Sequence, residues 1–140
     1  MNPGNIFLLG IDMVKDIKII EDAYNDKQGI TSAFNKNILN VVNHYAKTDF
    51  DPEMFEHMAF YNRDKKRIEM HLKATRDLVV SSTLFSESIV LKKYETIHTE
   101  NSHKFTEKDI FDMADVSGLI VKKVFVDKNK YFSLVLFECP

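Results

Sequence analysis

The sequence predicts an α+β fold in which the two ends of the chain form one partial sheet and enclose a separate α+β segment. Residues 6–9 and 119–137 have the patterns of strands, whereas residues 17–58 follow a mainly helical period and residues 67–104 return to short strands. With 140 residues and 44% apolar content, the chain is long enough to bury a core. We therefore expect one part at residues 1–16 and 105–140, and an inserted part at residues 17–104.

The first strand is expected at Ile6–Leu9, a continuous apolar run that ends at Gly10. Such a run is typical of a strand that is buried on both faces. From Ile17 the apolar period becomes helical, and Asp16 is a suitable N-cap for this helix.

A second helix is expected to follow, with Thr31 or Ser32 as its cap. Asn35 is expected outside its apolar stripe, which consists of Phe34, Ile38, Val41, Val42 and Tyr45. An N-cap acid and an N1 proline then predict a short helix over residues 51–58.

Strict alternation over Arg67–Leu72 predicts a strand whose apolar face is Ile68, Met70 and Leu72. Residues 78–81 and 88–91 are expected to form further short strands. A meander is expected to connect these strands to a last one near Thr99.

The C-terminal part is predicted to be a helix followed by a hairpin. Thr106 and Asp109 have the spacing of a capping box, and Gly118 is well placed to end a helix that runs through Ala114. Apolar runs at residues 119–126 and 131–137 flank a polar turn, which predicts two antiparallel strands.

Glu100 and Ser102 lie two residues apart at the end of a strand-patterned run, so both side chains are expected on one face. A carboxylate beside a hydroxyl suits the recognition of a small polar ligand. The alternative is a solvated strand end followed by an ordinary helix cap, and the spacing alone leaves both interpretations open.

Composition excludes several classes of function. A net charge of −2 and a pI near 6.2 give no electrostatic reason to expect nucleic acid or an anionic membrane as a partner. The single cysteine, Cys139, cannot form an internal disulfide, which fits a reducing cytoplasm. The N-terminal residues match neither a signal peptide nor a membrane span.

The five histidines do not have the spacing of a known metal motif, so we expect no metal site. Cys139 has no histidine near it in the sequence that could lower the pKa of its thiol, and we therefore expect no catalytic nucleophile.

Four ordered blocks carry a further signal: Phe7–Asp16, Phe55–Asn62, Arg67–Leu72 and Thr99–Phe105. Together they resemble the C-terminal half of the histidine-specific, S-adenosylmethionine-dependent methyltransferases, the family of the ergothioneine-pathway enzyme that trimethylates the α-amino group of histidine. The resemblance implies that residues 1–16 and 105–140 are the last strands and terminal hairpin of a class I methyltransferase sheet. It also implies that residues 17–104 form the inserted substrate-recognition domain.

The resemblance extends to four substrate-binding residues. Glu100 and Ser102 match the residues that recognise the imidazole of histidine, Tyr24 matches a tyrosine that contacts the substrate carboxylate, and Met70 matches a methionine that lines the pocket. From the residues alone, Tyr24 reads as a core aromatic, and Met70 can serve both as a packing residue and as a pocket wall. The implied substrate is histidine or a similar amino acid.

The sequence lacks the glycine-rich turn with which a class I methyltransferase binds S-adenosylmethionine, because Gly4, Gly10, Gly29 and Gly118 form no G-x-G pattern. We therefore expect the cofactor site upstream of this chain, and an inactive fragment that self-associates through unpaired strands, as a dimer. The alternative is a stand-alone α+β module that binds a small ligand or dimerises without catalysis.

Overall fold

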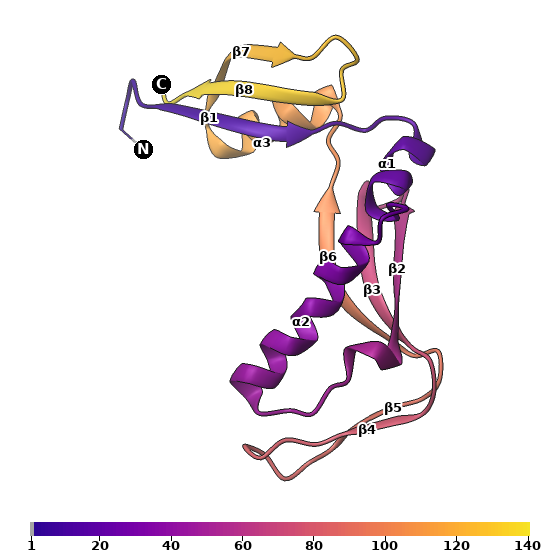
Figure 1. Ribbon diagram of the computed structural model, residues 1–140. Coiled ribbons are helices and arrows are strands. Elements are labelled where there is room, and N and C mark those ends of the chain that lie inside the picture. The colour runs from indigo at the N-terminus through magenta and orange to yellow at the C-terminus, as the bar shows by residue number, and fades with distance from the viewer. Residues whose placement is uncertain (1) are drawn as a thin grey trace. The chain divides into compact units, whose positions relative to one another are not determined.

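The computed structural model describes residues 2–140, which form three α-helices, a short 3₁₀-helix and eight strands (Figure 1). They group into two compact units. Unit 1 contains the segment that ends at Asp16, together with Arg63–Arg67 and His103–Pro140, and unit 2 contains Ile17–Asn62 and Ile68–Ser102. None of the helices within residues 2–140 has the length and apolar content needed to cross a membrane.

Unit 1 is built on a three-stranded sheet with the order β1–β8–β7, formed by β1 (Ile6–Asp12), β7 (Ile120–Val126) and β8 (Phe132–Glu138). β8 lies in the middle and is antiparallel to both neighbours, and its pairing with β1 runs from Ile6 opposite Glu138 to Asp12 opposite Phe132. The predicted hairpin and the predicted pairing of the two chain ends are therefore both observed.

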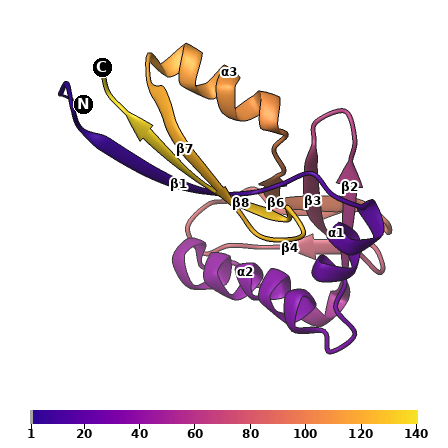
Figure 2. The same ribbon diagram turned by 90° about the horizontal axis from the view of Figure 1, so that it is seen from above.

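Helix α3 (Glu107–Ser117) covers one face of this sheet (Figure 2), where Ile110 and Ala114 pack against Ile11 and Val135. Its N-terminus has the predicted capping box, and its C-terminus has Gly118 in the left-handed conformation that glycine adopts without strain. The helix runs three residues beyond the predicted end at Ala114.

Strand β1 differs from the prediction in length and in burial. It continues through Gly10 to Asp12, and Ile6, Phe7 and Leu8 are exposed rather than buried on both faces. The physical reason is that β1 is an edge strand, which pairs with β8 on one side only among the described residues. The glycine permits the close approach of Phe132, because a Cβ on Gly10 would lie 2.9 Å from the tip of that ring.

Unit 2 has a sheet with the order β2–β3–β6, formed by β2 (Phe55–Asn62), β3 (Arg67–Ala74) and β6 (Thr96–His103). Among residues 2–140, β4 (Leu78–Val80) and β5 (Ile89–Leu91) pair only with each other, so the predicted single meander is wrong. The predicted alternation of β3 is confirmed, since Ile68, Met70 and Leu72 are all buried.

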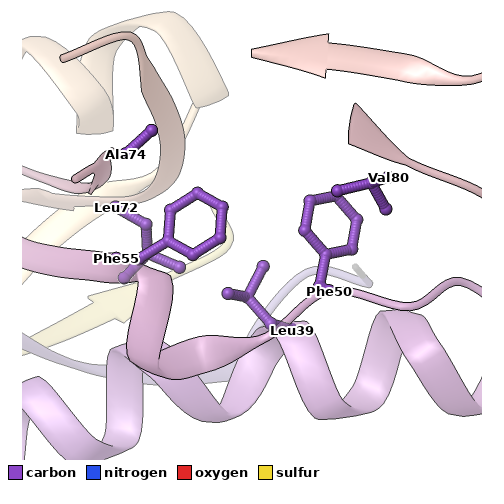
Figure 3. Packing of buried hydrophobic residues seen from close by; sticks show 6 residues of the cluster. All are labelled: Leu39, Phe50, Phe55, Leu72, Ala74 and Val80. Atoms are coloured by element: carbon purple, nitrogen blue, oxygen red, sulfur yellow. The ribbon is translucent and has the colours of Figure 1, made fainter. Parts of the chain in front are cut away.

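Helices α1 (Ile17–Tyr24) and α2 (Ile30–Ala46) pack on the β2–β3–β6 sheet (Figures 1 and 2). Each fully buried aliphatic side chain contributes about 1.5–3 kcal/mol relative to an exposed one. The largest buried cluster joins α2, the sheet and the β4–β5 hairpin, and Figure 3 shows its members: Leu39, Phe50, Phe55, Leu72, Ala74 and Val80.

The cap and the buried face of α2 both differ from the prediction. Neither Thr31 nor Ser32 caps the helix; the carboxylate of Asp26 accepts hydrogen bonds from the backbone N–H groups of Ile30 and Thr31. Hydrogen bonds from Thr31, and then that from Ile30, lower the pKa of Asp26 to about 2.

Most of the expected apolar stripe of α2 faces solvent, and Phe34 is 65% exposed. Asn35 and Leu39 are the buried residues of the helix instead. Burial of Asn35 is possible because its amide is fully engaged in hydrogen bonds, described below.

The predicted short helix over residues 51–58 is also shorter than expected. Asp51 caps a single 3₁₀ turn, Pro52–Met54, and the chain then enters β2 at Phe55. Pairing of β2 in the sheet outweighs the local helix signal of the cap and the proline.

Candidate functional site

Tyr24 and Ser102, two of the four predicted site residues, meet in unit 2. Tyr24 is the last residue of α1, and its hydroxyl donates a hydrogen bond to Ser102 Oγ at 2.6 Å. Ser102 lies near the end of β6, and 78 residues separate the two in the sequence. Both side chains are partly buried, so the pair remains accessible to a small molecule.

An irregularity in β6 makes this meeting possible. The side chains of Thr99 and Ser102 both contact the helices, because Thr99 bonds to Asn35 of α2 and Ser102 bonds to Tyr24 of α1. Residues three apart on a regular strand point to opposite faces. Thr99 and Glu100 are adjacent and both half-buried, so the alternation of burial along β6 shifts by one residue between them. Beyond this shift, Glu100 and Ser102 lie on the same side as the helices.

Glu100 lines a pocket of about 180 Å³ between β6 and α2. The other lining residues are Phe34, Asn35, Asn37, Ile38, Val41 and Thr99. Residues of α2 thus form most of the wall, with three apolar side chains among them, and the Glu100 carboxylate supplies a hydrogen-bond acceptor. This combination suits a small, flat, polar group that carries an N–H donor.

A buried hydrogen-bond network lies beneath the pocket. The side-chain NH₂ of Asn35 donates to His57 Nδ1 at 2.9 Å and to the His71 carbonyl at 3.1 Å, and its Oδ1 accepts from the Thr99 hydroxyl at 2.6 Å. His57 Nε2 lies 2.9 Å from the Tyr24 carbonyl, which assigns the ring hydrogen to Nε2. The network therefore ties the end of α1 to β6.

Sequence reasoning missed this network, whereas the apolar residues of the pocket wall, Phe34, Ile38 and Val41, belong to the stripe that it identified. Asn35, Leu39 and Val42 have the i, i+4, i+7 spacing of one helix face, and this spacing was the available signal. The hydrophobic pattern assigns an asparagine to the exposed face of a helix, so it did not predict that Asn35 is buried.

Met70 does not line the pocket. It is 2% exposed and packs with Ile20 and Ile68 in a small core cluster, with Tyr24 at the edge of that cluster. Its position supports the packing role, and the role as a pocket wall stays a prediction.

Unit 1 contains a second, larger cavity of about 640 Å³ between α3 and the sheet. Its walls are mainly apolar, with Phe7, Leu9, Met113 and Phe137 among them. Lys66 and Asp109 form an ion pair in its lining, with Nζ and Oδ1 2.7 Å apart.

Asp12, at the end of β1, lies close to two lysines. Its carboxylate pairs with Lys15 and with Lys104, whose Nζ is 3.2 Å away and whose side chain is almost completely buried. This arrangement supports a structural role for Asp12.

Comparisons with known proteins place these residues in context. The family model described as histidine-specific methyltransferase, SAM-dependent, matches residues 1–139. A histidine N-alpha-methyltransferase of Mycolicibacterium smegmatis is 37% identical over 136 residues, which are 97% of this chain and 42% of that protein. The corresponding protein of Mycobacterium tuberculosis is 35% identical over the same share of each chain. The chain thus spans less than half the length of these curated relatives.

Proposed function

Because the chain belongs to the family of histidine-specific, S-adenosylmethionine-dependent methyltransferases, we propose that it is the substrate-recognising part of an N-methyltransferase. The substrate would be the α-amino group of histidine or a similar amino acid. The names of the two relatives support this substrate. The structural observation that carries the proposal is the contact between Tyr24 and Ser102, together with Glu100, which lies two residues before Ser102 on β6 and lines a pocket of about 180 Å³.

In this proposal each side chain has a stated task. Glu100 accepts an imidazole N–H, and Ser102 exchanges a hydrogen bond with the ring. For Tyr24 to bind the substrate carboxylate, its hydroxyl proton must turn from Ser102 toward the substrate. Met70 supports the site from the core. Transfer of a methyl group to a neutral amine needs mainly alignment and exclusion of water, so these residues act by positioning.

We also propose that β1, β8 and β7 correspond to the last strands of a class I methyltransferase sheet, and that unit 2 is an insertion in it. Support comes from the position of β8 between two antiparallel neighbours and from the exposed apolar residues of the edge strand β1. That exposed edge also leads us to propose self-association of the isolated chain as a dimer. The single cysteine supports a cytoplasmic location, where histidine methylation would serve an ergothioneine-type pathway.

The residues present do not fit the family's cofactor. A cofactor cradle needs glycines close together in one turn, so that backbone N–H groups can approach the ligand. Within residues 2–140, Gly4, Gly10, Gly29 and Gly118 lie in separate turns and elements and form no such turn.

The 140-residue chain alone should neither bind S-adenosylmethionine nor methylate histidine. Calorimetric titration of the folded chain with the cofactor tests the first statement. A dissociation constant below about 100 µM, which corresponds to roughly −5.5 kcal/mol, would show that the cofactor site is contained in these residues.

The substrate proposal is tested by kinetics in an enzyme of the relatives' full length that contains this chain. A hydrogen bond to a charged group contributes about 1.5–3 kcal/mol, so Glu100→Ala should lower kcat/KM for histidine roughly 10- to 150-fold. Ser102→Ala removes a neutral bond and should cost about tenfold or less. Thermal stability should change little, because Glu100 faces a pocket rather than the core.

Glu87→Ala is the matched control, because Glu87 is an exposed loop residue outside the pocket. Histidine kinetics within twofold of wild type in Glu100→Ala would end the proposal of imidazole recognition.

A further inference from the structure

The face of the β2–β3–β6 sheet opposite the Met70 side carries a cluster of potential metal ligands. Glu69 and His71 alternate with the buried Ile68 and Met70 along β3, so they project away from that core. His98 of β6 joins them, and its ring stacks on that of His71 with centroids 4.4 Å apart. One ligand atom from each of the three side chains lies within 4.8 Å of the other two.

Two of the three side chains are already oriented by other groups. Glu69 Oε1 accepts a hydrogen bond from the Asn62 amide at 3.1 Å, while Oε2 points toward His71 Nε2 at 3.7 Å. His98 Nε2 lies 3.1 Å from the Glu100 carbonyl. A carbonyl only accepts, so this contact assigns the ring hydrogen to Nε2 and leaves the lone pair on Nδ1. Such outer contacts fix the tautomer and direction of metal ligands.

His71 is the unexplained member of the cluster. Both of its ring nitrogens are shielded from solvent, and neither makes a hydrogen bond to any residue between 2 and 140. The ring stacks between His98 and Phe60. The neighbouring acceptor, Glu69 Oε2, lies 3.7 Å from His71 Nε2, which is beyond hydrogen-bond distance. A buried polar group without a hydrogen bond costs about 1–3 kcal/mol, so such a group calls for a ligand or another compensation.

We propose that Glu69, His71 and His98 bind a divalent transition-metal ion of the zinc type, with solvent completing the coordination. Two imidazoles and one carboxylate form a donor set that zinc accepts. Zinc ligand bonds of about 2.0–2.2 Å place the ligand atoms of a tetrahedral site about 3.4 Å apart, so the side chains must approach one another by up to about 1.5 Å. His98, which is exposed on an edge strand, can make this adjustment by tilting out of its stack.

This site is independent of the proposed substrate pocket, since its ligands do not line that pocket. The ion would join β3 to β6, and the position filled by solvent would stay open to a further ligand. Spacing in the sequence did not reveal the cluster, since the nearest pair, Glu69 and His71, is completed by a residue from another strand.

The test is titration of the 140-residue chain with Zn²⁺ by calorimetry and with Co²⁺ by visible absorption. We expect one equivalent to bind with a dissociation constant below about 100 µM, with Co²⁺ giving d–d bands typical of four or five ligands. His71→Ala and His98→Ala should each weaken binding by at least about tenfold. His98→Ala is the more informative variant, because the His98 side chain is exposed and contributes less to packing than the largely buried His71 ring.

His44→Ala is the matched control, since His44 is exposed on α2 and lies outside the cluster. It should bind Zn²⁺ like the wild type. The proposal is overturned if the folded wild-type chain binds no Zn²⁺ in this range, or if a folded His98→Ala variant binds it within twofold of the wild type.

Discussion

Asp109 has two partners that bear on the pH dependence of stability. Its carboxylate accepts from Lys66 Nζ and from both the backbone N–H and the hydroxyl of Thr106. Burial alone would raise the pKa of Asp109, but the hydrogen bonds from Lys66 and Thr106 outweigh it and lower the pKa to about 2.

The folded state therefore favours the ionised form of Asp109, whose ordinary pKa is 3.8. The resulting stabilisation is fully present above about pH 4 and is lost as the pH falls toward 2. We expect about 1–2 kcal/mol, after allowance for the partial exposure of the pair. Urea unfolding at pH 7 and pH 3 measures this contribution.

Asp109→Asn is the appropriate variant, because asparagine keeps one acceptor oxygen for the helix cap and loses the charge and one of the two oxygens that accept from Lys66. It should be less stable than the wild type at pH 7, and the difference should shrink at pH 3. Lowered pKa values also occur at Asp26, Asp77 and Asp127. The wild type and the Asp109→Asn variant therefore both lose stability in acid. An equal difference at both pH values would contradict the assignment to Asp109.

At the scale of residues, the sequence allowed only part of the candidate site to be predicted. The alternation rule placed Glu100 and Ser102 together, and the contact between Ser102 and Tyr24 agrees with a shared site. The rule could not reveal that β6 changes its alternation at Thr99, or that Asn35 is buried, because both depend on partners distant in the sequence. The functional roles of Tyr24, Met70, Glu100 and Ser102 stay predictions.

At the scale of elements, locally encoded features were predicted best. The capping box and the C-terminal glycine of α3 lie within the helix's own sequence, as do the alternation of β3 and the hairpin of β7 and β8. The start of β2 was not predicted, because Pro52 begins a helical turn that sheet pairing then ends at Phe55. The prediction of the buried face of α2 was wrong, because the hydrogen-bonded Asn35 occupies a buried position where an apolar residue was expected.

The packing between α2 and the sheet can be tested at Leu72. This side chain of β3 is fully buried in the cluster of Figure 3. Leu72→Ala removes apolar contacts and leaves a cavity, so the free energy of unfolding should fall by about 2–5 kcal/mol. Denaturant unfolding followed by circular dichroism measures the change.

Leu84→Ala is the matched control, because Leu84 is an exposed residue of the β4–β5 segment. It should change the free energy of unfolding by less than about 0.5 kcal/mol. Equal effects of the two substitutions would mean that the cluster does not stabilise unit 2 as described.

At the scale of the whole molecule, the pairing of β1 with β8 joins segments more than a hundred residues apart, and the strand patterns of the two ends anticipated it. The grouping of Arg63–Arg67 with unit 1 was not anticipated. It arises because Lys104 donates its backbone N–H to the Lys66 carbonyl, while the Lys66 side chain pairs with Asp109. The assignment of the two parts as a methyltransferase core and an insertion stays a prediction.

The exposed edge of β1 gives the last prediction. Ile6 and Leu8 are both more than half exposed, and β8 occupies only one side of the strand among residues 2–140. Unpaired backbone groups on an apolar edge favour pairing with another chain, and pairing of identical edges produces a two-fold dimer. Light scattering coupled to size-exclusion chromatography should therefore give a dimer for the 140-residue chain.

Leu8→Lys should shift that chain toward the monomer, because a charged side chain on an edge strand opposes further pairing. Ile30→Lys, a substitution at a similarly exposed apolar residue of α2, should leave the dimer intact. A monomeric wild-type chain at high concentration would argue against association through β1. If Ile30→Lys dissociated the dimer and Leu8→Lys did not, the contact would lie on α2 instead. The exposed apolar residues of β1 would then not form the dimer interface.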